Sequence, residues 1–332
     1  MKTLRSAKRL MAGAVAALAA CLALPGQAQT GAESYPNKPI RLFMGQSPGG
    51  APDILARILA DHVGRRLGAS VVIEYKPSAG GIIAQNALLS MPADGHALLM
   101  GTPSILAVTP YINKKLPFDP FKDFKPVTIV GESANILVAG PSVKAGSVAE
   151  LIEYAKAHPG ELKFASAGLG TPAHLAGELL AAQTGVKLLH VPYKGAGQAL
   201  NDLVGGTVDF MITSPASSKP FLAGGHLKAL ATTGREPDPL LPELPLMRAT
   251  VPGYEITQWW GFVVRSGTPD DIVGKIQQAV AQTLEDPKVI QQFKDQGVTP
   301  RSLTPEGFSK FLDEERRRYQ DLIKRANIAV EH

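Results

Sequence analysis

The stretch Lys163-Phe-Ala-Ser-Ala-Gly-Leu-Gly-Thr-Pro-Ala-His-Leu-Ala-Gly-Glu178 predicts the unit around which the rest of the chain is organised. Its first four residues suit a short strand, Gly168 and Gly170 mark a turn, and a helix follows. Thr171 is a good N-cap, and Pro172 is a good first helical residue. Free amides at a helix N-terminus, together with the helix dipole, favour a carboxylate or a phosphate. We therefore predict that amides of this turn face an anion.

Two further units repeat this design nearer the start of the chain. Residues 40–44 form an apolar run of strand length, followed by Ser47-Pro-Gly-Gly50 and a helix from Pro52. Residues 71–75 are rich in β-branched side chains, and residues 76–81 form a turn before another helix. Because these units lack an evident nucleophile, they indicate anion binding without chemistry.

The N-terminus has the features of a secretory signal peptide. A basic start is followed by an apolar run over residues 10–24 and by Pro25-Gly-Gln-Ala28. We predict cleavage after Ala28, a signal peptide over residues 1–28 and a periplasmic location. In an alternative reading, residues 18–21 form a lipoprotein signal, which would leave Cys21 lipidated. The apolar run continues past Cys21, so we favour export without a lipid anchor.

Charge and cysteine content exclude several classes of function. The chain carries a formal net charge of +5, and residues 1–28 hold four basic residues and no acidic one, which leaves +1 after processing. A nucleic-acid binder needs a basic stripe that survives processing, and none is evident. Cys21 is the only cysteine, so the processed chain has neither a disulfide nor a thiolate zinc site.

The remaining pattern predicts two α/β domains. Strands and helices alternate over residues 35–123, and a second α/β unit follows over residues 130–233. We expect further strands at residues 97–100, 163–166, 188–191, 208–213, 227–232 and 258–264. Residues 214–218 are predicted as a polar turn, residues 235–245 as a surface loop, and residues 314–318 as a solvated helix face.

Two α/β halves, with a C-terminal segment that returns to the first half, resemble a periplasmic binding protein. The resemblance implies the fold class α/β, a two-domain periplasmic-binding-protein fold of type II-like organisation. Domain 1 is discontinuous, over residues 29–129 and 234–332, and domain 2 covers residues 130–233. In such a fold two Rossmann-like halves hold the ligand in the cleft between them, near the carboxyl ends of the strands.

Several catalytic and cofactor motifs are absent or incomplete. Residues 168–173 match the form of a dinucleotide fingerprint, but no acidic residue follows the next strand, which ends near Tyr193. No nucleophile elbow occurs around Ser166, and no nucleophile and base pair is evident. The seven histidines are scattered without zinc-ligand spacing, so we predict no metal and no cofactor. His174 is read either as a contact of the anion site or as a packing histidine.

Two other groups also leave alternatives open. Asp53 and Arg57 lie four residues apart and form a surface ion pair, unless Asp53 holds the glycine loop before it. Trp259 and Trp260 line the cleft or pack in the core, and core packing is favoured for at least one of them.

Eight short motifs, in order, resemble the Bug-type solute receptors of tripartite tricarboxylate transporters over essentially the whole processed chain. They are Tyr35-Pro-x-Lys-Pro-Ile-Arg41, Gly49-Gly-x-x-Asp53-x-x-Ala-Arg57, Pro77-x-Ala-Gly-Gly81, Pro92-x-Asp-Gly95, Ala165-Ser-Ala-Gly168-x-Gly-Thr-Pro-x-His-Leu175, Val191-Pro-Tyr-Lys-Gly195, Asp202-Leu-x-Gly-Gly-x-Val-Asp209 and Gly267-Thr-Pro269.

The resemblance implies a receptor that holds carboxylates with backbone amides, hydroxyls and ordered water rather than with arginine. Many members have Pro-Phe where this chain has Gly45-Gln46, so Gln46 is our candidate specificity residue. The predicted ligand-binding residues are Gln46, Ser47, Pro48, Gly49, Gly50, Asp53, Ser78, Ser104, Ser166, Gly168, Gly170, Thr171, His174, Tyr193 and Ser214.

We therefore predict a monomeric, non-enzymatic receptor for a di- or tricarboxylate or an aromatic acid. It would close over its ligand and deliver it to membrane transporter subunits. Two alternatives come from other classes: an adaptor for a membrane sensor kinase and a secreted hydrolase.

Overall fold

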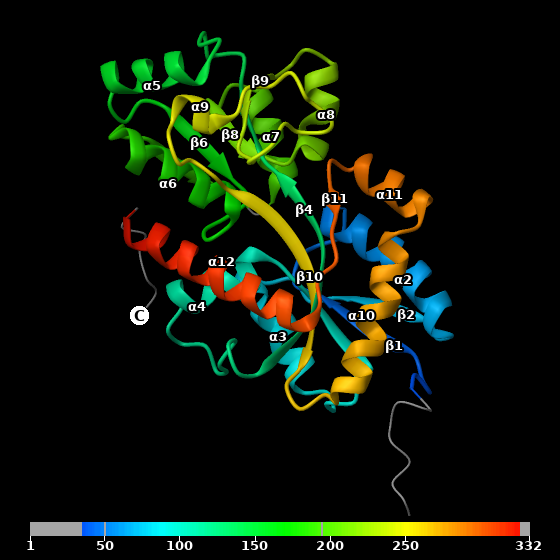
Figure 1. Ribbon diagram of the computed structural model, residues 1–332. Coiled ribbons are helices and arrows are strands. Elements are labelled where there is room, and N and C mark those ends of the chain that lie inside the picture. The colour runs from blue at the N-terminus through cyan, green and yellow to red at the C-terminus, as the bar shows by residue number, and fades with distance from the viewer. Residues whose placement is uncertain (1–34, 50, 194, 326–332) are drawn as a thin grey trace, which may run out of the picture. The chain divides into compact units, whose positions relative to one another are not determined.

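A computed structural model describes residues 35–49, 51–193 and 195–325 (Figure 1). The chain divides after Tyr35, and the description below concerns the compact unit that begins at Pro36. The predicted signal peptide, Cys21 and Gly50 lie outside the described residues.

The first of two sheets is six-stranded, in the order β11-β4-β10-β3-β1-β2. Its parallel part matches the prediction, because β1 pairs in parallel with both β2 and β3. The strands β4, β10 and β11 add an antiparallel part that the alternating pattern did not indicate. Its strands are β1 (Ile40–Met44), β2 (Val71–Tyr75), β3 (Ala97–Gly101), β4 (Phe124–Ala134), β10 (Thr257–Arg265) and β11 (Thr299–Pro300).

Helices cover both faces of the six-stranded sheet. On one side α2 packs on β2 and on α10, and on the other α12 packs along β4 (Figure 1). The short α3 packs on β1 and β3. The helices are α2 (Ala51–Leu67), α3 (Ile82–Leu89), α4 (Thr109–Ile112), α10 (Asp270–Leu284), α11 (Pro287–Lys294) and α12 (Pro305–Arg325), with short helical turns at Ala79–Gly81 and Ser104–Val108.

The second sheet is five-stranded, in the order β7-β6-β8-β5-β9. The central strand β6 pairs in parallel with β7 and β8, whereas β5 is antiparallel to β8 and β9. Its strands are β5 (Ile136–Ala139), β6 (Lys163–Ser166), β7 (Leu189–Pro192), β8 (Phe210–Thr213) and β9 (Lys228–Thr232), and its helices are α5 (Val148–Ala157), α6 (Pro172–Thr184), α7 (Ala196–Val204), α8 (Pro215–Ala223) and α9 (Met247–Thr250).

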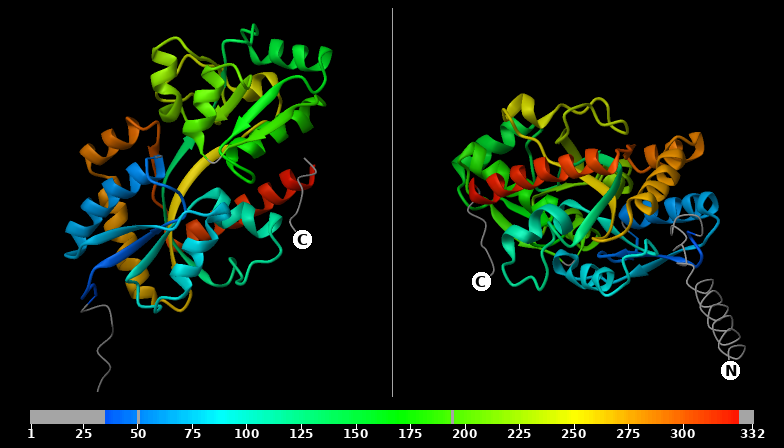
Figure 2. Two further views of the ribbon diagram at one scale, coloured as in Figure 1. Left: turned by 180° about the vertical axis from the view of Figure 1, so that it is seen from behind. Right: turned by 60° about the horizontal axis from the view of Figure 1, so that its bottom comes forward.

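Three chain segments connect the two sheets and are bonded to one another at the crossing. Strand β4 reaches Ala134 in the first sheet, and β5 begins in the second at Ile136. Between them Asn135 donates its backbone N–H to Thr233 Oγ1 at 3.0 Å, and Thr233 Oγ1 donates to the Ile256 carbonyl at 2.6 Å. Figures 1 and 2 show β4 and β10 running together from one sheet toward the other. The predicted domain boundaries stay predictions, although the first one, at residues 129/130, falls within β4.

Two expectations about local structure are wrong. Residues 214–218 form no polar turn, because α8 begins at Pro215 and the Ser214 side chain accepts from the Ser217 amide. A serine followed by proline is a helix start signal, which the sequence reading passed over.

The solvated face predicted for residues 314–318 is also wrong in part, because Glu315 is 7% exposed. Its carboxylate accepts from Trp259 Nε1 at 2.7 Å and from Arg318 at 2.9 Å. The core packing favoured for one tryptophan is confirmed for both, since Trp259 and Trp260 are 0% and 2% exposed.

Candidate functional site

Most predicted site residues lie in the segments that follow the carboxyl ends of parallel strands. In the six-stranded sheet these segments follow β1, β2 and β3, and in the five-stranded sheet they follow β6, β7 and β8. Carboxyl ends of neighbouring parallel strands meet at the same edge of a sheet, and binding sites of α/β proteins form there. The two sheets therefore each present one group of loops.

The two groups of loops touch directly at Ser104 and Gly170. Ser104 follows β3, and its Oγ donates to the Gly170 carbonyl, which follows β6, at 3.2 Å. A Cβ atom at Gly170 would lie 2.7 Å from Ile112 Cδ1 of α4, so apolar packing accompanies the bond. The structure therefore brings together two predicted site residues from different sheets.

The central turn has the predicted helix start but not the predicted free amides. Thr171 is the N-cap of α6 and its side chain accepts from the His174 amide. The Gly168 amide donates to Ser166 Oγ at 3.1 Å, and the Gly170 amide donates to His174 Nδ1 at 3.1 Å. The Thr171 amide donates to the Gly168 carbonyl at 3.4 Å. The expectation that these three amides face an anion is wrong, because side chains and backbone of the turn already bond them.

His174 is a buried packing histidine as well as a neighbour of the turn. It is 5% exposed, and its ring stacks on His190 with centroids 4.3 Å apart. Burial, and next the charge of His190, lower the pKa of His174 to about 4. Because Nδ1 accepts from the Gly170 amide, the ring proton sits on Nε2, which lies 3.7 Å from Glu178 Oε1.

His190 contacts this turn from a neighbouring strand, and the sequence reading missed it. It lies on β7, and its Nε2 is 2.7 Å from Ser166 Oγ on β6. Its ring lies between Phe164 and His174, at centroid distances of 4.7 and 4.3 Å. Burial lowers its pKa to about 4, so the ring is neutral at neutral pH. The sequence signal was available: β6 and β7 are consecutive short strands, and pairing them sets Phe164 opposite His190.

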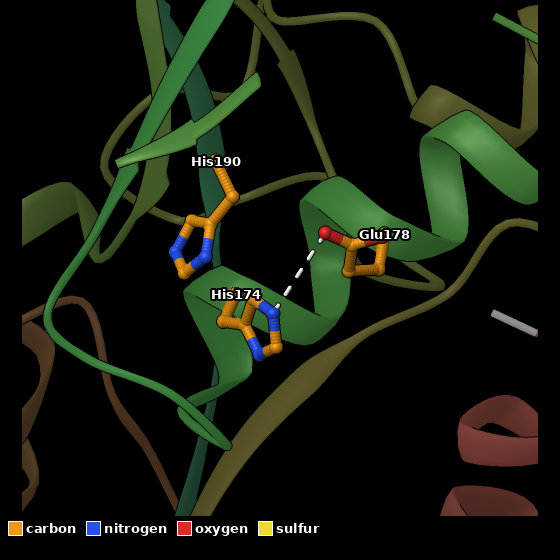
Figure 3. A group of neighbouring side chains, drawn as sticks. All are labelled: His174, Glu178 and His190. Atoms are coloured by element: carbon orange, nitrogen blue, oxygen red, sulfur yellow. Dashed lines mark ion pairs between the residues drawn. The ribbon is translucent and has the colours of Figure 1, made fainter. Parts of the chain in front are cut away.

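His174, Glu178 and His190 each have one nitrogen or oxygen atom that could bind a metal, and these three atoms lie within 4.8 Å of one another (Figure 3). A histidine binds a metal through an unprotonated nitrogen in the plane of its ring. His174 keeps its proton on the nitrogen that faces Glu178, and the two rings stack with only 30° between their planes. Their in-plane lone pairs therefore do not converge, and the geometry fits a hydrogen-bonded stack rather than a metal centre.

Ser166 and His190 also form the nucleophile and base pair that the sequence did not reveal. A serine at 2.7 Å from an imidazole is the arrangement used in acyl transfer. Ser166 is 0% exposed, however, and its Oγ also bonds both backbone groups of Gly168. This pair therefore holds the turn, and its oxygen is not presented to a substrate.

The loop after β1 is more exposed to solvent than the central turn, and one buried carboxylate holds its backbone. Asp53 accepts from the Gly49 amide at 2.9 Å, from Arg57 Nε at 3.0 Å and from the Tyr75 hydroxyl. The support of the loop by Asp53 is thus confirmed. The ion pair with Arg57 also forms, but it is not a surface pair on both sides, because the Asp53 carboxylate is buried. Burial raises the pKa of Asp53, but the bonds from Tyr75, Gly49 and Arg57 outweigh it and hold that pKa below its usual value. Ser47, Pro48 and Gly49 are exposed.

Gln46 lies between the ends of two neighbouring strands. It follows β1, and its Nε2 reaches Thr102 Oγ1, which follows β3, at 3.5 Å. Gln46 Oε1 is buried and has no hydrogen-bond partner within the described residues. A buried acceptor without a partner costs about 1–3 kcal/mol, so this amide has unused capacity for a polar group.

The other three predicted residues use their hydroxyl groups within their own loops. Ser78 Oγ accepts from the Ile83 amide at 3.0 Å, and Ser214 Oγ lies 2.7 Å from Ser217 Oγ. The Tyr193 hydroxyl donates to Asp202 at 2.8 Å; burial, and next Asp202, raise its pKa to about 12. These hydroxyl groups stabilise the loops that carry them. Tyr193 meets the central turn through its backbone instead, because its N–H donates to the Ser166 carbonyl at 3.0 Å.

A surface hollow of about 580 Å³ lies beside α2 and β2. Arg57 and Arg65 line it together with the apolar Val71 and Ile73. Both arginines are already paired, with Asp53 and with Asp61. None of the predicted site residues lines this hollow, so we keep the candidate site at the strand ends.

Comparison with known proteins agrees with this architecture. Residues 55–328 match the family model described as "Tripartite tricarboxylate transporter family receptor". The chain belongs to this family. It is also 33% identical to protein BugT of Bordetella pertussis over 299 residues, which cover 90% of this chain and 92% of BugT.

Two solved structures are similar over nearly the whole chain. Rpa4515 of R. palustris, solved with adipate, is 34% identical with a TM-score of 0.84, covering 90% of this chain and all of that one. MatC of Rhodopseudomonas palustris, solved with bound malate, is 29% identical with a TM-score of 0.78, covering 87% of this chain and all of that one.

The predicted Bug-type resemblance and the two-domain periplasmic-binding-protein fold are therefore confirmed. Members of this family are periplasmic solute-binding proteins. Within residues 35–49, 51–193 and 195–325, no helix combines the length and the apolar character needed to cross a bilayer.

Proposed function

We propose that this receptor binds a small organic carboxylate, a di- or tricarboxylate or an aromatic acid, between the two groups of loops. The observation that supports it most is that two relatives of nearly equal length were solved with the dicarboxylates adipate and malate. The direct bond between Ser104 and Gly170 places the loops of both sheets next to each other, as such a site requires.

Two amides of the five-stranded sheet are suited to meet the carboxylate. Helices α6 and α8 both have proline at their first position and a hydroxyl cap that bonds the third amide. Proline has no N–H at the first position, and the cap hydroxyl accepts from the third amide. The amide at the second position, Ala173 in α6 and Ala216 in α8, therefore has no hydrogen-bond acceptor within its own helix. Because β6 and β8 are parallel neighbours, both helices begin at the same edge of the sheet. Each helix dipole favours a negative charge there.

The test is a thermal melt of residues 29–332 against mono-, di-, tri- and aromatic carboxylates at one pH. A ligand at 100 times its Kd stabilises the fold by about 2.7 kcal/mol, which shifts Tm by several degrees at this size. In Ala173→Asp the new carboxylate suits a first helical turn but repels an anionic ligand, so the shift should disappear. Ala173→Asn is the matched neutral control and should keep it. Absence of any shift across the panel would contradict the proposal, and equal losses in both variants would contradict the assignment of Ala173.

Gln46 is our proposal for the specificity residue, since its Oε1 lacks a partner and its neighbour is the polar Thr102. A ligand hydroxyl could donate to that oxygen, whereas a phenylalanine could only pack. We expect malate to bind more tightly than succinate, which differs from it by one hydroxyl. Gln46→Phe should remove most of that difference, and an unchanged ratio of the two Kd values would refute the assignment.

We further propose that the predicted leader exports the chain to the periplasm, with cleavage after Ala28. The predicted domains, residues 29–129 with 234–332 and residues 130–233, would then close over the ligand about the crossing at Asn135 and Thr233. The closed form would deliver its solute to membrane subunits of a tripartite tricarboxylate-type transporter. Small-angle scattering with and without saturating ligand tests the closure.

A further inference from the structure

We infer that His190 is a positioning residue for solute binding, which acts through Ser166 to fix the conformation of the central turn. This inference rests on the proposed function, because the turn is taken to face the solute. His190 itself lies on the neighbouring strand β7 and bonds the turn only through a second side chain.

The first step is the chain of bonds from β7 into the turn. His190 Nε2 lies 2.7 Å from Ser166 Oγ, and the same oxygen accepts from the Gly168 amide at 3.1 Å. Gly168 has a φ of 125°, a conformation that L side chains rarely adopt. Glycine adopts it because it has no Cβ atom, and for the same reason its own sterics do not hold it there. The Ser166 hydroxyl, oriented by the imidazole, therefore supplies much of the restraint.

The second step is the restraint on the histidine ring. It stacks between Phe164 at 4.7 Å and His174 at 4.3 Å, and both of these residues are nearly fully buried. Gly177 makes the stack possible, because a Cβ there would lie 2.2 Å from the Phe164 ring. A ring packed on both faces has little freedom, so Nε2 is held where Ser166 needs it.

The third step links this restraint to the other sheet. His174 is the ring at the end of the stack. Its Nδ1 accepts from the Gly170 amide at 3.1 Å, and the Gly170 carbonyl accepts from Ser104 Oγ at 3.2 Å. The two ends of the turn are thus held by two stacked histidines, one through Ser166 and one directly. A substitution at His190 should therefore increase amide hydrogen exchange more at Gly168 than at Gly170.

The experiment is a double-mutant cycle on residues 29–332 with His190→Phe, Ser166→Ala and the double variant. Phenylalanine keeps a flat ring in the stack but removes the nitrogen that bonds Ser166. His158→Phe is the matched control, because His158 also stacks on an aromatic ring, Tyr154 at 4.3 Å, but follows the C-terminus of α5 and makes no contact with the turn among the described hydrogen bonds. Calorimetry with adipate and malate gives Kd, a melt gives Tm, and amide hydrogen exchange reports on Gly168 and Gly170.

We expect each single change to weaken binding of the tighter acid about tenfold, and the double variant to weaken it no further, since both act through one contact. Exchange at Gly168 should accelerate at least tenfold in His190→Phe and stay unchanged in His158→Phe. Fully additive losses in Kd, or an unchanged Kd with faster exchange, would overturn the inference.

The two levels of failure can be told apart. If the wild-type chain binds neither acid nor any other acid of the panel, the proposed function fails, and the solute-facing part of this inference fails with it. The exchange measurement needs no solute, so it still decides whether His190 holds the turn. Unchanged exchange at Gly168, with binding intact, would overturn the inference alone.

Discussion

The loop after β1 and the turn after β6 have the same sequence design, yet the structure treats them differently. Both follow a strand with glycines and lead into a helix through proline. In the first, Ser47, Pro48 and Gly49 are exposed and a single carboxylate, Asp53, holds the backbone. In the second, Ser166 and His174 are buried and bond the backbone at two points. A shared motif therefore specifies a turn and a helix start, but not how rigidly the turn is held.

The largest expected effect comes from disturbing the packing under the rigid turn. Gly177→Val should destabilise the protein by on the order of 3 kcal/mol, because any Cβ at this position meets the Phe164 ring. Urea unfolding measures the free energy of unfolding. Gly274→Ala in the middle of α10 is the control, since no atom lies within 4 Å of the added Cβ. That control should gain about 0.5–1 kcal/mol.

The second prediction is that the turn after β6 and the loop after β1 lose their contributions to stability at different pH values. Burial holds the pKa of His174 and His190 at about 4, below the ordinary value of 6.5, so the unfolded chain binds more protons between these values. Stability should be full above pH 6.5 and fall as the pH drops toward 4. The lowered pKa of Asp53 acts only below its unfolded value of 3.8, where its contribution to stability is lost.

Urea unfolding at a series of pH values, in His190→Phe and in wild type, tests whether the histidines cause the loss of stability between pH 6.5 and 4. Between pH 6.5 and 4, the slope of the free energy of unfolding against pH reports how many more protons the unfolded chain binds. Removing one buried histidine should lower that number by up to one. Asp53→Asn should leave that slope unchanged. An identical slope in wild type and His190→Phe would contradict the assignment of the acid sensitivity to the stacked histidines.

The third prediction weakens the open loop. Asp53→Asn should cost about 1.5–3 kcal/mol, because Asp53 is 5% exposed and accepts three hydrogen bonds as an ion. Asp61→Asn is a matched control on the same helix, where Asp61 faces Arg65 at 2.7 Å but is exposed. That change should cost no more than about 0.5 kcal/mol. Equal costs in denaturant unfolding would show that the loop does not depend on Asp53.

The smallest expected effect is at the contact between the two groups of loops. Ser104→Ala removes one half-buried hydroxyl that donates to the Gly170 carbonyl, so it should cost about 0.5–1.5 kcal/mol. Exchange at the Gly170 amide should remain slow, because His174 still holds it. A loss well above this range would mean that the contact contributes more to the association of the loops than one hydrogen bond can.

The sequence by itself determined the family, the strands of the parallel parts of both sheets and the start of α6, although it missed the start of α8. Thr171 and Pro172 predicted the start of α6 because capping depends on adjacent residues alone. The support of the first loop by Asp53 was also readable, since Asp53 lies four residues from the amide that it accepts.

Only the tertiary structure decided which groups of the site are free and which are already bonded. Ser166 meets His190 across 24 positions because β6 and β7 pair, and Gln46 meets Thr102 across 56 because β1 and β3 do. Glu315, read as solvated, is buried because Trp259 and Arg318 donate to it. Short-range patterns record local backbone preferences. The partner of a buried polar side chain depends on which distant strands and helices pack together, which no single stretch of sequence states.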